Sequence, residues 1–208
     1  MTIDELIKYN RESRKKYIDA KYLSSEPKEV SHSPSKKYRF EITHYADEGI
    51  NKQGNPYHQS FMTCSVYKGE ERIFSINGST AFYAEWVERN DENSFLICTE
   101  CYQGYGVLNL NTLEYKFFLP PEALNGMGYI WVGGHLSPGN DKIAIIGCVW
   151  GWPYQIKIFD LQSPMTMPYA VLFETSYDNE YSEIIGWRNN SEFLFKDSKN
   201  IEVIAKTV

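Results

Sequence analysis

A pattern that recurs about every fifty residues constrains the fold of this 208-residue chain more than any other feature. Each copy opens with an aromatic or histidine residue, passes through a turn into an apolar strand, and continues into a second pair of strands. The copies begin at Trp86, His135 and Trp187. A unit of this size is a small sheet that cannot bury both of its faces alone. Several such units must therefore pack side by side around a common core.

The first two copies match at further positions. Cys98 and Cys148 follow the apolar strand in each copy, and Leu110 and Leu161 end the last strand. The turn at residues 137–140 reads Ser-Pro-Gly-Asn, which combines a preset φ with residues that tolerate positive φ and so favours a tight reversal. The third copy has the same opening but a much shorter connecting loop.

Segments upstream of the repeats also have the signature of strands. Period-two alternation predicts strands over residues 38–45, 60–67 and 72–76, with a hairpin turn at residues 68–70. Over the whole chain the patterns predict about fourteen short strands. The side chains predicted to be buried between sheets are Phe95, Ile97, Ile145 and Phe195.

One stretch of the chain carries a resemblance to a known fold. Residues 135–145 read His-Leu-Ser-Pro-Gly-Asn-Asp-Lys-Ile-Ala-Ile, and residues 156–161 read Ile-Lys-Ile-Phe-Asp-Leu. This resembles a blade of a TolB-like or WD-repeat β-propeller, in which a Ser-Pro-Asp-Gly turn precedes an apolar strand and a Tyr-or-Phe-Asp-Leu strand follows. The resemblance implies four-stranded antiparallel blades. Because propellers serve unrelated functions, it implies no activity.

We therefore expect an all-β fold, a small β-propeller-like array of about four antiparallel blades, since four blades of forty to fifty residues would use most of the chain. The third copy lacks a fourth strand. The ring is then either incomplete or closed by the strand over residues 38–45, which would cover the open edge. A plain antiparallel β-sandwich is the competing architecture.

The N-terminal segment differs from the rest. The run Thr-Ile-Asp-Glu at residues 2–5 is a capping box, and apolar residues at helical spacing predict a helix over residues 3–19. Serines and prolines in residues 22–36 predict a surface linker. We thus expect residues 1–36 to form a helix and polar linker, and residues 37–208 to form a single β-propeller-like domain. Residues 1–40 hold 10 Lys and Arg against 6 Asp and Glu, and the remainder holds 11 against 21, so charge as well as the apolar stripe of the helix favours its docking on the body.

Composition places the chain among soluble globular proteins. No apolar run approaches the length of a membrane span, and the charged first twenty residues lack the apolar segment of a secretory signal, so we expect a cytoplasmic protein with no membrane partner. The formal net charge of −6 disfavours nucleic acid as a partner, because phosphate binding needs a basic face. A nucleic-acid adaptor that uses the basic helix remains a third class of function.

The cysteine and histidine spacing predicts no metal site and no cofactor. Cys98 and Cys101 form a Cys-x-x-Cys pair without a second pair of ligands at comparable spacing. Cys98 and Cys148 occupy matching positions in the repeat, and we expect both to be small buried apolar side chains.

Two loops at equivalent positions of the repeat carry the candidate binding residues. They span residues 100–105 and 149–154, and should emerge at the same end of adjacent blades. Pro153 should hold Trp152 extended, so that the aromatic rings project to one side as a platform for a sugar ring, a proline-rich peptide or an arginine. The competing interpretation is that these rings plug the centre of a narrow propeller. The candidate ligand-binding residues are Tyr102, Gln103, Tyr105, Trp150, Trp152 and Tyr154.

The sequence favours a non-enzymatic binding or scaffold module that recognises a protein, a peptide or a small ligand with this aromatic loop face. It leaves open whether the protein is an enzyme. The alternative is a hydrolase at the same face, with Glu85 and Glu100 as a carboxylate pair of which one is desolvated to act as an acid. His135 is a further catalytic candidate, although its place in the repeat also fits a structural role.

Overall fold

The computed structural model describes residues 1–79, 82–89, 93–151, 153–175 and 181–207, which fold mainly as antiparallel sheet. The chain divides into two compact units. The N-terminal unit comprises residues 1–82 together with 99–102, and the C-terminal unit comprises residues 83–98 and 103–208. None of the described helices is both long and apolar enough to cross a membrane.

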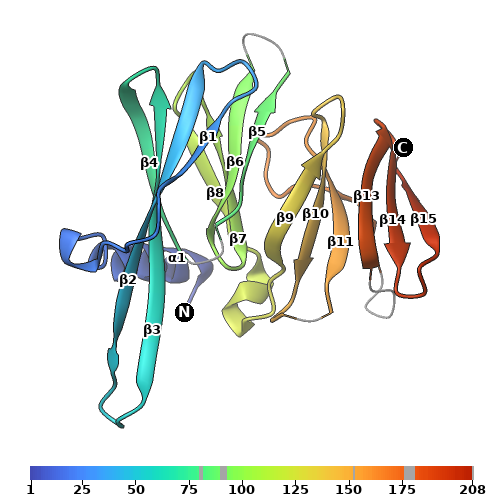
Figure 1. Ribbon diagram of the computed structural model, residues 1–208. Helices are drawn as coiled ribbons and strands as arrows, with labels where there is room; N and C mark the ends of the chain where they lie inside the picture. The colour runs from blue at the N-terminus through green and yellow to red at the C-terminus, as the bar shows by residue number, and fades with distance from the viewer. Residues whose placement is uncertain (80–81, 90–92, 152, 176–180, 208) are drawn as a thin grey trace. The chain divides into compact units, whose positions relative to one another are not determined.

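The N-terminal unit contains an α-helix, a short 3-10 helix and a four-stranded sheet in chain order (Figure 1). Its elements are α1 (Ile3–Lys15), η1 (Ala20–Tyr22), β1 (Glu29–His32), β2 (Tyr38–Ile50), β3 (Pro56–Lys68) and β4 (Glu71–Ser79). The capping box is confirmed, because Thr2 Oγ1 accepts from the Glu5 backbone N–H and the Glu5 carboxylate accepts from the Thr2 N–H. The helix ends at Lys15 rather than at residue 19.

Two predictions for this region are wrong. Residues 38–45 do not close the last sheet, because they belong to β2 and pair on one side with β1 and on the other with β3. The predicted linker also contains a strand, since residues 29–32 pair with β2 as β1. Helix α1 belongs to the same compact unit as this sheet. That residues 37–208 form one domain stays a prediction.

The strands β2 and β3 pair along their whole length, from Tyr38 opposite Lys68 to Ile50 opposite Pro56. Among the described residues β4 covers only part of β3, residues 61–68. The remainder of β2 and β3 extends as a two-stranded ribbon (Figure 1). Both faces of this ribbon are therefore less covered than those of the sheet that carries it.

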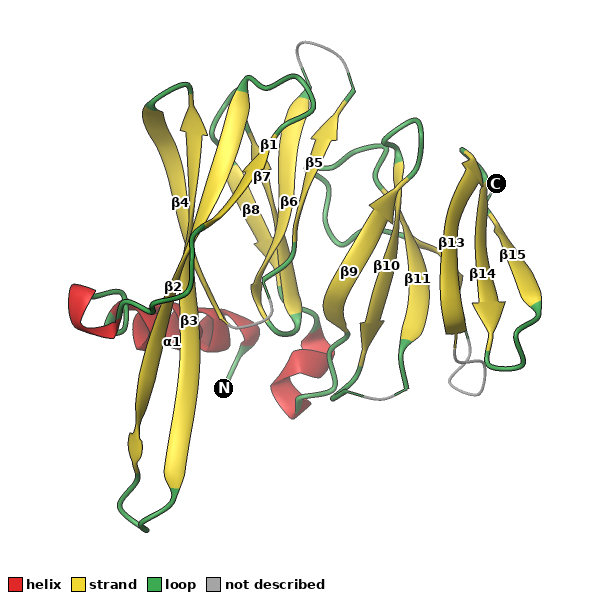
Figure 2. Cartoon of the chain, viewed as in Figure 1, coloured by secondary structure: helices red, strands yellow, loops and turns green. Residues whose placement is uncertain are grey.

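The C-terminal unit contains most of three further sheets, each a meander in chain order (Figure 2). The first is β5 (Ala84–Glu88), β6 (Ser94–Cys101), β7 (Gly104–Asn109) and β8 (Tyr115–Phe118), and the end of β6 belongs to the N-terminal unit. The second, reached through η2 (Pro121–Asn125), is β9 (Ile130–Leu136), β10 (Lys142–Cys148), β11 (Gln155–Asp160) and β12 (Val171–Glu174). The third is β13 (Tyr181–Asn189), β14 (Glu192–Asp197) and β15 (Glu202–Lys206).

The all-β, blade-like architecture is confirmed. The described residues form four separate antiparallel sheets of three or four strands, with an N-terminal helix, rather than the two facing sheets of a sandwich. Trp86, His135 and Trp187 each lie in the first strand of a sheet and pair with its second strand. The indole N–H of Trp187 also donates to the backbone oxygen of His135 at 2.8 Å.

Two apolar cores join the three sheets of the C-terminal unit. One lies between the sheets β5–β8 and β9–β12, and the other between β9–β12 and β13–β15. The four side chains predicted to be buried, and both cysteines at matching repeat positions, are buried; they are Phe95, Ile97, Ile145, Phe195, Cys98 and Cys148. The repeat therefore identifies the core positions correctly.

Polar contacts between turns add to these cores. The Arg89 guanidinium donates to the backbone oxygens of Asn140 at 3.0 Å and Gln162 at 2.8 Å, and the Asn140 amide donates to the Glu88 backbone oxygen at 2.6 Å. In the next sheet, Asn190 Oδ1 accepts from the Gly139 backbone N–H at 2.8 Å. Matching turns of successive sheets are thus bonded to one another.

Helix α1 docks through charge, as its composition predicts. Glu100 accepts two hydrogen bonds of 2.7 Å from Arg11 and one of 3.0 Å from Arg14, which also donates to the Glu100 backbone oxygen. Only 3% of the Glu100 side chain and 5% of the Arg14 side chain are exposed. The basic helix therefore holds a buried carboxylate in a two-arginine clamp.

Candidate ligand-binding pocket

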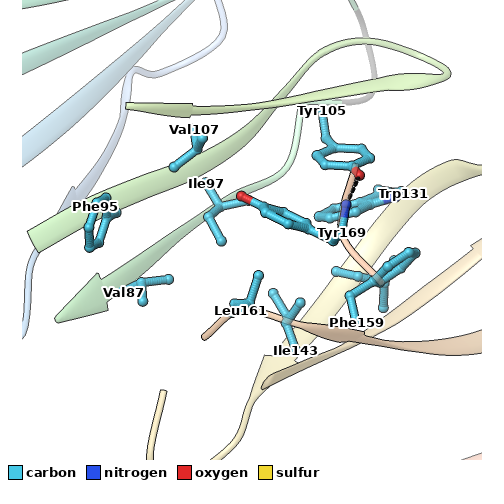
Figure 3. Close-up of a cluster of buried hydrophobic side chains, with 11 residues drawn as sticks. Val87, Phe95, Ile97, Tyr105, Val107, Trp131, Ile143, Phe159, Leu161 and Tyr169 are labelled. Atoms are coloured by element: carbon cyan, nitrogen blue, oxygen red, sulfur yellow. Dashed lines mark hydrogen bonds between the residues drawn. The ribbon is translucent and has the colours of Figure 1, made fainter. Parts of the chain in front are cut away.

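The aromatic side chains of the C-terminal unit gather between the sheets β5–β8 and β9–β12 (Figure 3). The ring of Tyr105, from β7, stacks on Trp131 of β9 with centroids 4.5 Å apart and on Tyr169 with centroids 5.0 Å apart. Trp131 in turn lies 5.2 Å from Phe159 of β11. These rings are buried because inward positions of three strands and one loop converge on the same space.

Hydrogen bonds fix the two tyrosines within this cluster. The Tyr105 hydroxyl accepts from the Tyr169 backbone N–H at 3.0 Å, as Figure 3 shows, and the Tyr169 hydroxyl donates to the Pro164 oxygen at 2.8 Å. Burial raises the pKa of Tyr105 to about 12 and raises the pKa of Tyr169 further. Both phenols therefore stay neutral and serve as structural groups.

A pocket of about 440 Å³ opens onto this cluster. Its volume lies within the range usual for sites that take small ligands or single side chains. The lining is mostly aromatic rings, prolines and aliphatic side chains with a few polar groups. It consists of Gln103, Tyr105, Phe118, Pro120, Pro121, Glu122, Met127, Gly128, Tyr129, Trp131, Val149, Lys157, Phe159, Pro168, Tyr169 and Val171.

Two polar side chains of the pocket, Lys157 and Gln103, are already engaged. The Lys157 ammonium lies 4.6 Å from the centroid of the Tyr129 ring and 3.0 Å from a Glu174 carboxylate oxygen. The Gln103 side-chain amide donates to the Gly126 backbone oxygen at 2.5 Å. These contacts hold the walls in place, so the apolar surface dominates what the pocket offers to a ligand.

The structure brings together some of the residues predicted from the two loops. Gln103 and Tyr105 line the pocket. The indole of Trp150 packs against Gly126, where a Cβ would lie 3.3 Å from its ring, and 64% of Trp150 is exposed. The loops at residues 100–105 and 149–154 thus meet at Gly126.

The other predicted residues lie elsewhere. Tyr102 belongs to the N-terminal unit and lines a different pocket there, and Tyr154 is half-buried outside the lining described above. Trp152 lies outside the described residues. A ligand-binding role for all six predicted residues stays a prediction.

The extended aromatic platform is not formed at Trp150. Trp150 and Gly151 have φ values of 55° and 92°, which place both in the left-handed region. The reason is the hairpin itself: β10 and β11 pair up to Gly147 opposite Gln155, and the chain must reverse within the residues between them. The loop therefore turns at Trp150, and the ring lies on the neighbouring Gly126.

The sequence does not identify most of the pocket. Trp131, Phe159 and Tyr169 read as ordinary core residues, and the remaining walls come from the connections β8–β9 and β11–β12. These connections carry Pro120-Pro121 and Met167-Pro168 beside aromatic residues, and this composition could have indicated a pocket. Prolines and methionines in loops next to a core are suited to form apolar walls.

The two carboxylates proposed as a hydrolytic pair have separate partners. Glu100 is held by the two arginines of α1, whereas Glu85 accepts from the Tyr83 hydroxyl and from the Trp86 backbone N–H, both at 3.2 Å. Burial raises the pKa of Glu85. The two residues belong to different compact units, and their catalytic role stays a prediction.

His135 has surroundings that suit a structural role. Its ring lies 5.9 Å from that of Phe193, and its backbone oxygen accepts from the Trp187 indole. Partial burial lowers the pKa of His135, so its imidazole is neutral at physiological pH. A catalytic role for it stays a prediction.

Comparisons with known proteins assign no activity to the chain. No protein-family model matches the chain. Over 121 residues, 53% of this chain, it is 24% identical to an uncharacterized protein of Acanthamoeba polyphaga mimivirus, of which the match spans 45%. The chain therefore spans less than half the length of this relative.

Two solved structures are similar to the chain. The β-propeller domain of Cps50 (Swd1) from Myceliophteria thermophila aligns with 87% of this chain and 66% of its own length, at 8% identity and a TM-score of 0.47. TolB from Acinetobacter baumannii aligns with 86% of this chain and 55% of its own length, at 12% identity and a TM-score of 0.38. At these scores the likeness carries no argument, and the architecture rests on the strand pairing itself.

Proposed function

We propose that the protein is a binding module whose pocket in the C-terminal unit receives an apolar side chain of a partner protein segment. The observation that carries this proposal is the lining: an open pocket of about 440 Å³ walled by aromatic rings, prolines and methionine next to a rigid aromatic cluster. Such a concave apolar surface with few polar groups is the usual form of a recognition site.

The chemistry of the lining favours an apolar occupant over a sugar. A sugar ring needs several hydrogen-bond partners besides an aromatic face. Of the polar side chains that line this pocket, Lys157 and Gln103 already bind Glu174 and Gly126, which leaves the exposed Glu122 carboxylate as the main charged group on offer. An aliphatic or aromatic side chain needs no such partners, and burying one contributes about 1.5–3 kcal/mol.

The mouth of the pocket is formed by exposed apolar side chains. Met127 and Val171 are both exposed and both line the pocket. Val171 begins β12, which is the edge strand of its sheet among the described residues. An extended partner segment can therefore lie along this edge and insert one side chain.

A matched pair of valines tests the proposal. Val171 and Val132 belong to the same sheet and are each 49% exposed, but only Val171 lines the pocket. Peptides selected from a displayed library against the intact protein should lose about tenfold or more in affinity for V171E, because a carboxylate then enters an apolar mouth. V132E should bind as the unmodified protein does.

Isothermal titration of the selected peptides against all three proteins gives the comparison. Equal affinity for V171E and the unmodified protein, or equal losses in V171E and V132E, would place binding elsewhere and refute the proposal. Circular dichroism of each variant confirms that the fold is retained.

A further inference from the structure

The ribbon formed by β2 and β3 carries a hydrogen-bonded chain of three side chains. His58 Nδ1 lies 2.6 Å from a carboxylate oxygen of Glu48, and His58 Nε2 lies 2.6 Å from the hydroxyl oxygen of Ser60. All three residues belong to the N-terminal unit. A nucleophile bonded to a base that is itself oriented by a third group is the arrangement that activates serine for acyl transfer.

The register of the hairpin builds this arrangement. Glu48 lies directly opposite His58 in the β2–β3 pairing, so their side chains share a face. Ser60 follows two residues later on β3, which brings its side chain to the same face as His58. The register continues to Ile50 opposite Pro56, where a five-residue loop joins β2 to β3.

The hydrogen-bond chemistry defines the direction of proton transfer. An ionised carboxylate only accepts hydrogen bonds, so His58 Nδ1 must carry the proton that it shares with Glu48. In the neutral imidazole, Nε2 is then the acceptor, and the Ser60 hydroxyl donates to it. The base is therefore in the tautomer that can remove the serine proton.

His58 and Ser60 border a cavity of about 590 Å³. It is lined by Tyr9, Ser13, Lys16, Tyr17, His58, Gln59, Ser60, Phe61, Ser79 and Tyr102. The rings of Tyr17 and Phe61 stack 4.1 Å apart and nearly parallel. Lys16 supplies a positive charge to the same cavity. The cavity thus offers a substrate an aromatic surface and the positive charge of Lys16, whose ammonium lies 4.4 Å from the centroid of the Tyr17 ring.

We propose that Glu48, His58 and Ser60 form a Ser-His-Glu catalytic site that hydrolyses carboxylic esters with an aromatic group. Ser60 Oγ attacks the ester carbonyl carbon while its proton passes to His58 Nε2. The bond from that carbon to the alcohol oxygen breaks, and His58 returns the proton to the leaving alcohol. Water then attacks the acyl carbon and gives a proton to His58. The bond between that carbon and Ser60 Oγ breaks, His58 returns the proton to Oγ, and the acid is released. Overall, ester and water give acid and alcohol.

The solvent exposure of Glu48 and His58 limits the rate of ester hydrolysis that we expect. The Glu48 and His58 side chains are 67% and 59% exposed, so water screens their interaction and weakens the electrostatic contribution to catalysis. We therefore expect slow turnover and correspondingly slow covalent labelling of Ser60. This site is independent of the binding pocket in the C-terminal unit.

The test uses the full chain and an alkyl fluorophosphonate, which forms a phosphonate ester with an activated serine and releases fluoride. Mass spectrometry of proteolytic fragments should locate the label on Ser60. S60A should abolish it, and H58Q should slow labelling by about 100-fold because the general base is lost. E48Q should slow it less. The rate of p-nitrophenyl butyrate hydrolysis should fall most in S60A, less in H58Q and least in E48Q.

Two matched variants serve as controls. His44 lies 3.1 Å from a carboxylate oxygen of Glu29, and Ser75 is an exposed serine on β4. H44Q and S75A should label and turn over at the unmodified rate. Absence of label on Ser60, or equal labelling of the unmodified protein and H58Q, would overturn the proposal and leave the three residues as a polar ladder on the ribbon.

Discussion

The substitution Glu100→Gln is expected to lower the free energy of unfolding of the N-terminal unit by about 3–5 kcal/mol. Glu100 is buried against Arg11 and Arg14, and three hydrogen bonds of 2.7–3.0 Å bind its two oxygens. Glutamine retains the shape of the side chain but removes the charge. Arg14, only 4% exposed, would then be a buried cation without its carboxylate.

Hydrogen exchange of the α1 amides, together with urea denaturation, measures this effect within the N-terminal unit. Protection of α1 should fall with the free energy of unfolding, because the helix loses its main anchor. The control is Glu12→Gln on the same helix: Glu12 is exposed and pairs only with Lys15 among the described contacts. It should leave the urea midpoint unchanged. A Glu100→Gln protein as stable as the Glu12→Gln protein would contradict the clamp.

The second large effect is expected in the aromatic cluster. Trp131→Ala should cost about 3–5 kcal/mol, since it removes a ring that is 3% exposed, stacks on Tyr105 and packs at a tilt against Phe159. Trp150→Ala should cost less than about 1 kcal/mol, because most of that ring is exposed on a turn. Denaturant unfolding of the two variants provides the comparison. Equal costs would mean that Trp131 is not part of a packed core.

The contrast between these two tryptophans shows what the repeat could predict. The repeat positions fix which residues face a neighbouring sheet, because a β-strand alternates its faces and a shift of one residue would reverse them. Phe95, Ile145 and Phe195 are accordingly buried as predicted. The all-β class and the order of strands within each sheet follow from the same pattern and its turns.

The candidate site was predicted only in part, for a physical reason. Loop conformation depends on local φ values and on the pairing at both ends of the loop, and neither has a periodic signature. Trp150 therefore turns onto Gly126 instead of projecting in an extended platform. Gln103 and Tyr105 line the pocket because they adjoin or belong to β7, a strand that the repeat predicts, and their role in binding stays a prediction.

Contacts between segments far apart in the chain were equally hard to predict. The basic composition of α1 indicated docking through charge, but the choice of Glu100 as the partner depends on three-dimensional proximity. The Ser60 site differs, because the register of one hairpin places Glu48 opposite His58. A pairing scheme drawn around the turn between β2 and β3 would have revealed it.

The central claim, that the pocket in the C-terminal unit accepts an apolar side chain, is tested most directly by methyl NMR. The protein has five methionines, of which Met127 lines the pocket, whereas Met62 is buried in the N-terminal unit. With ¹³C-methyl methionine in the intact chain, titration with N-acetyl-phenylalanine amide should shift the Met127 methyl signal saturably and leave that of Met62 unchanged. A Met127 signal that does not move, or that moves no more than the Met62 signal, would contradict the claim.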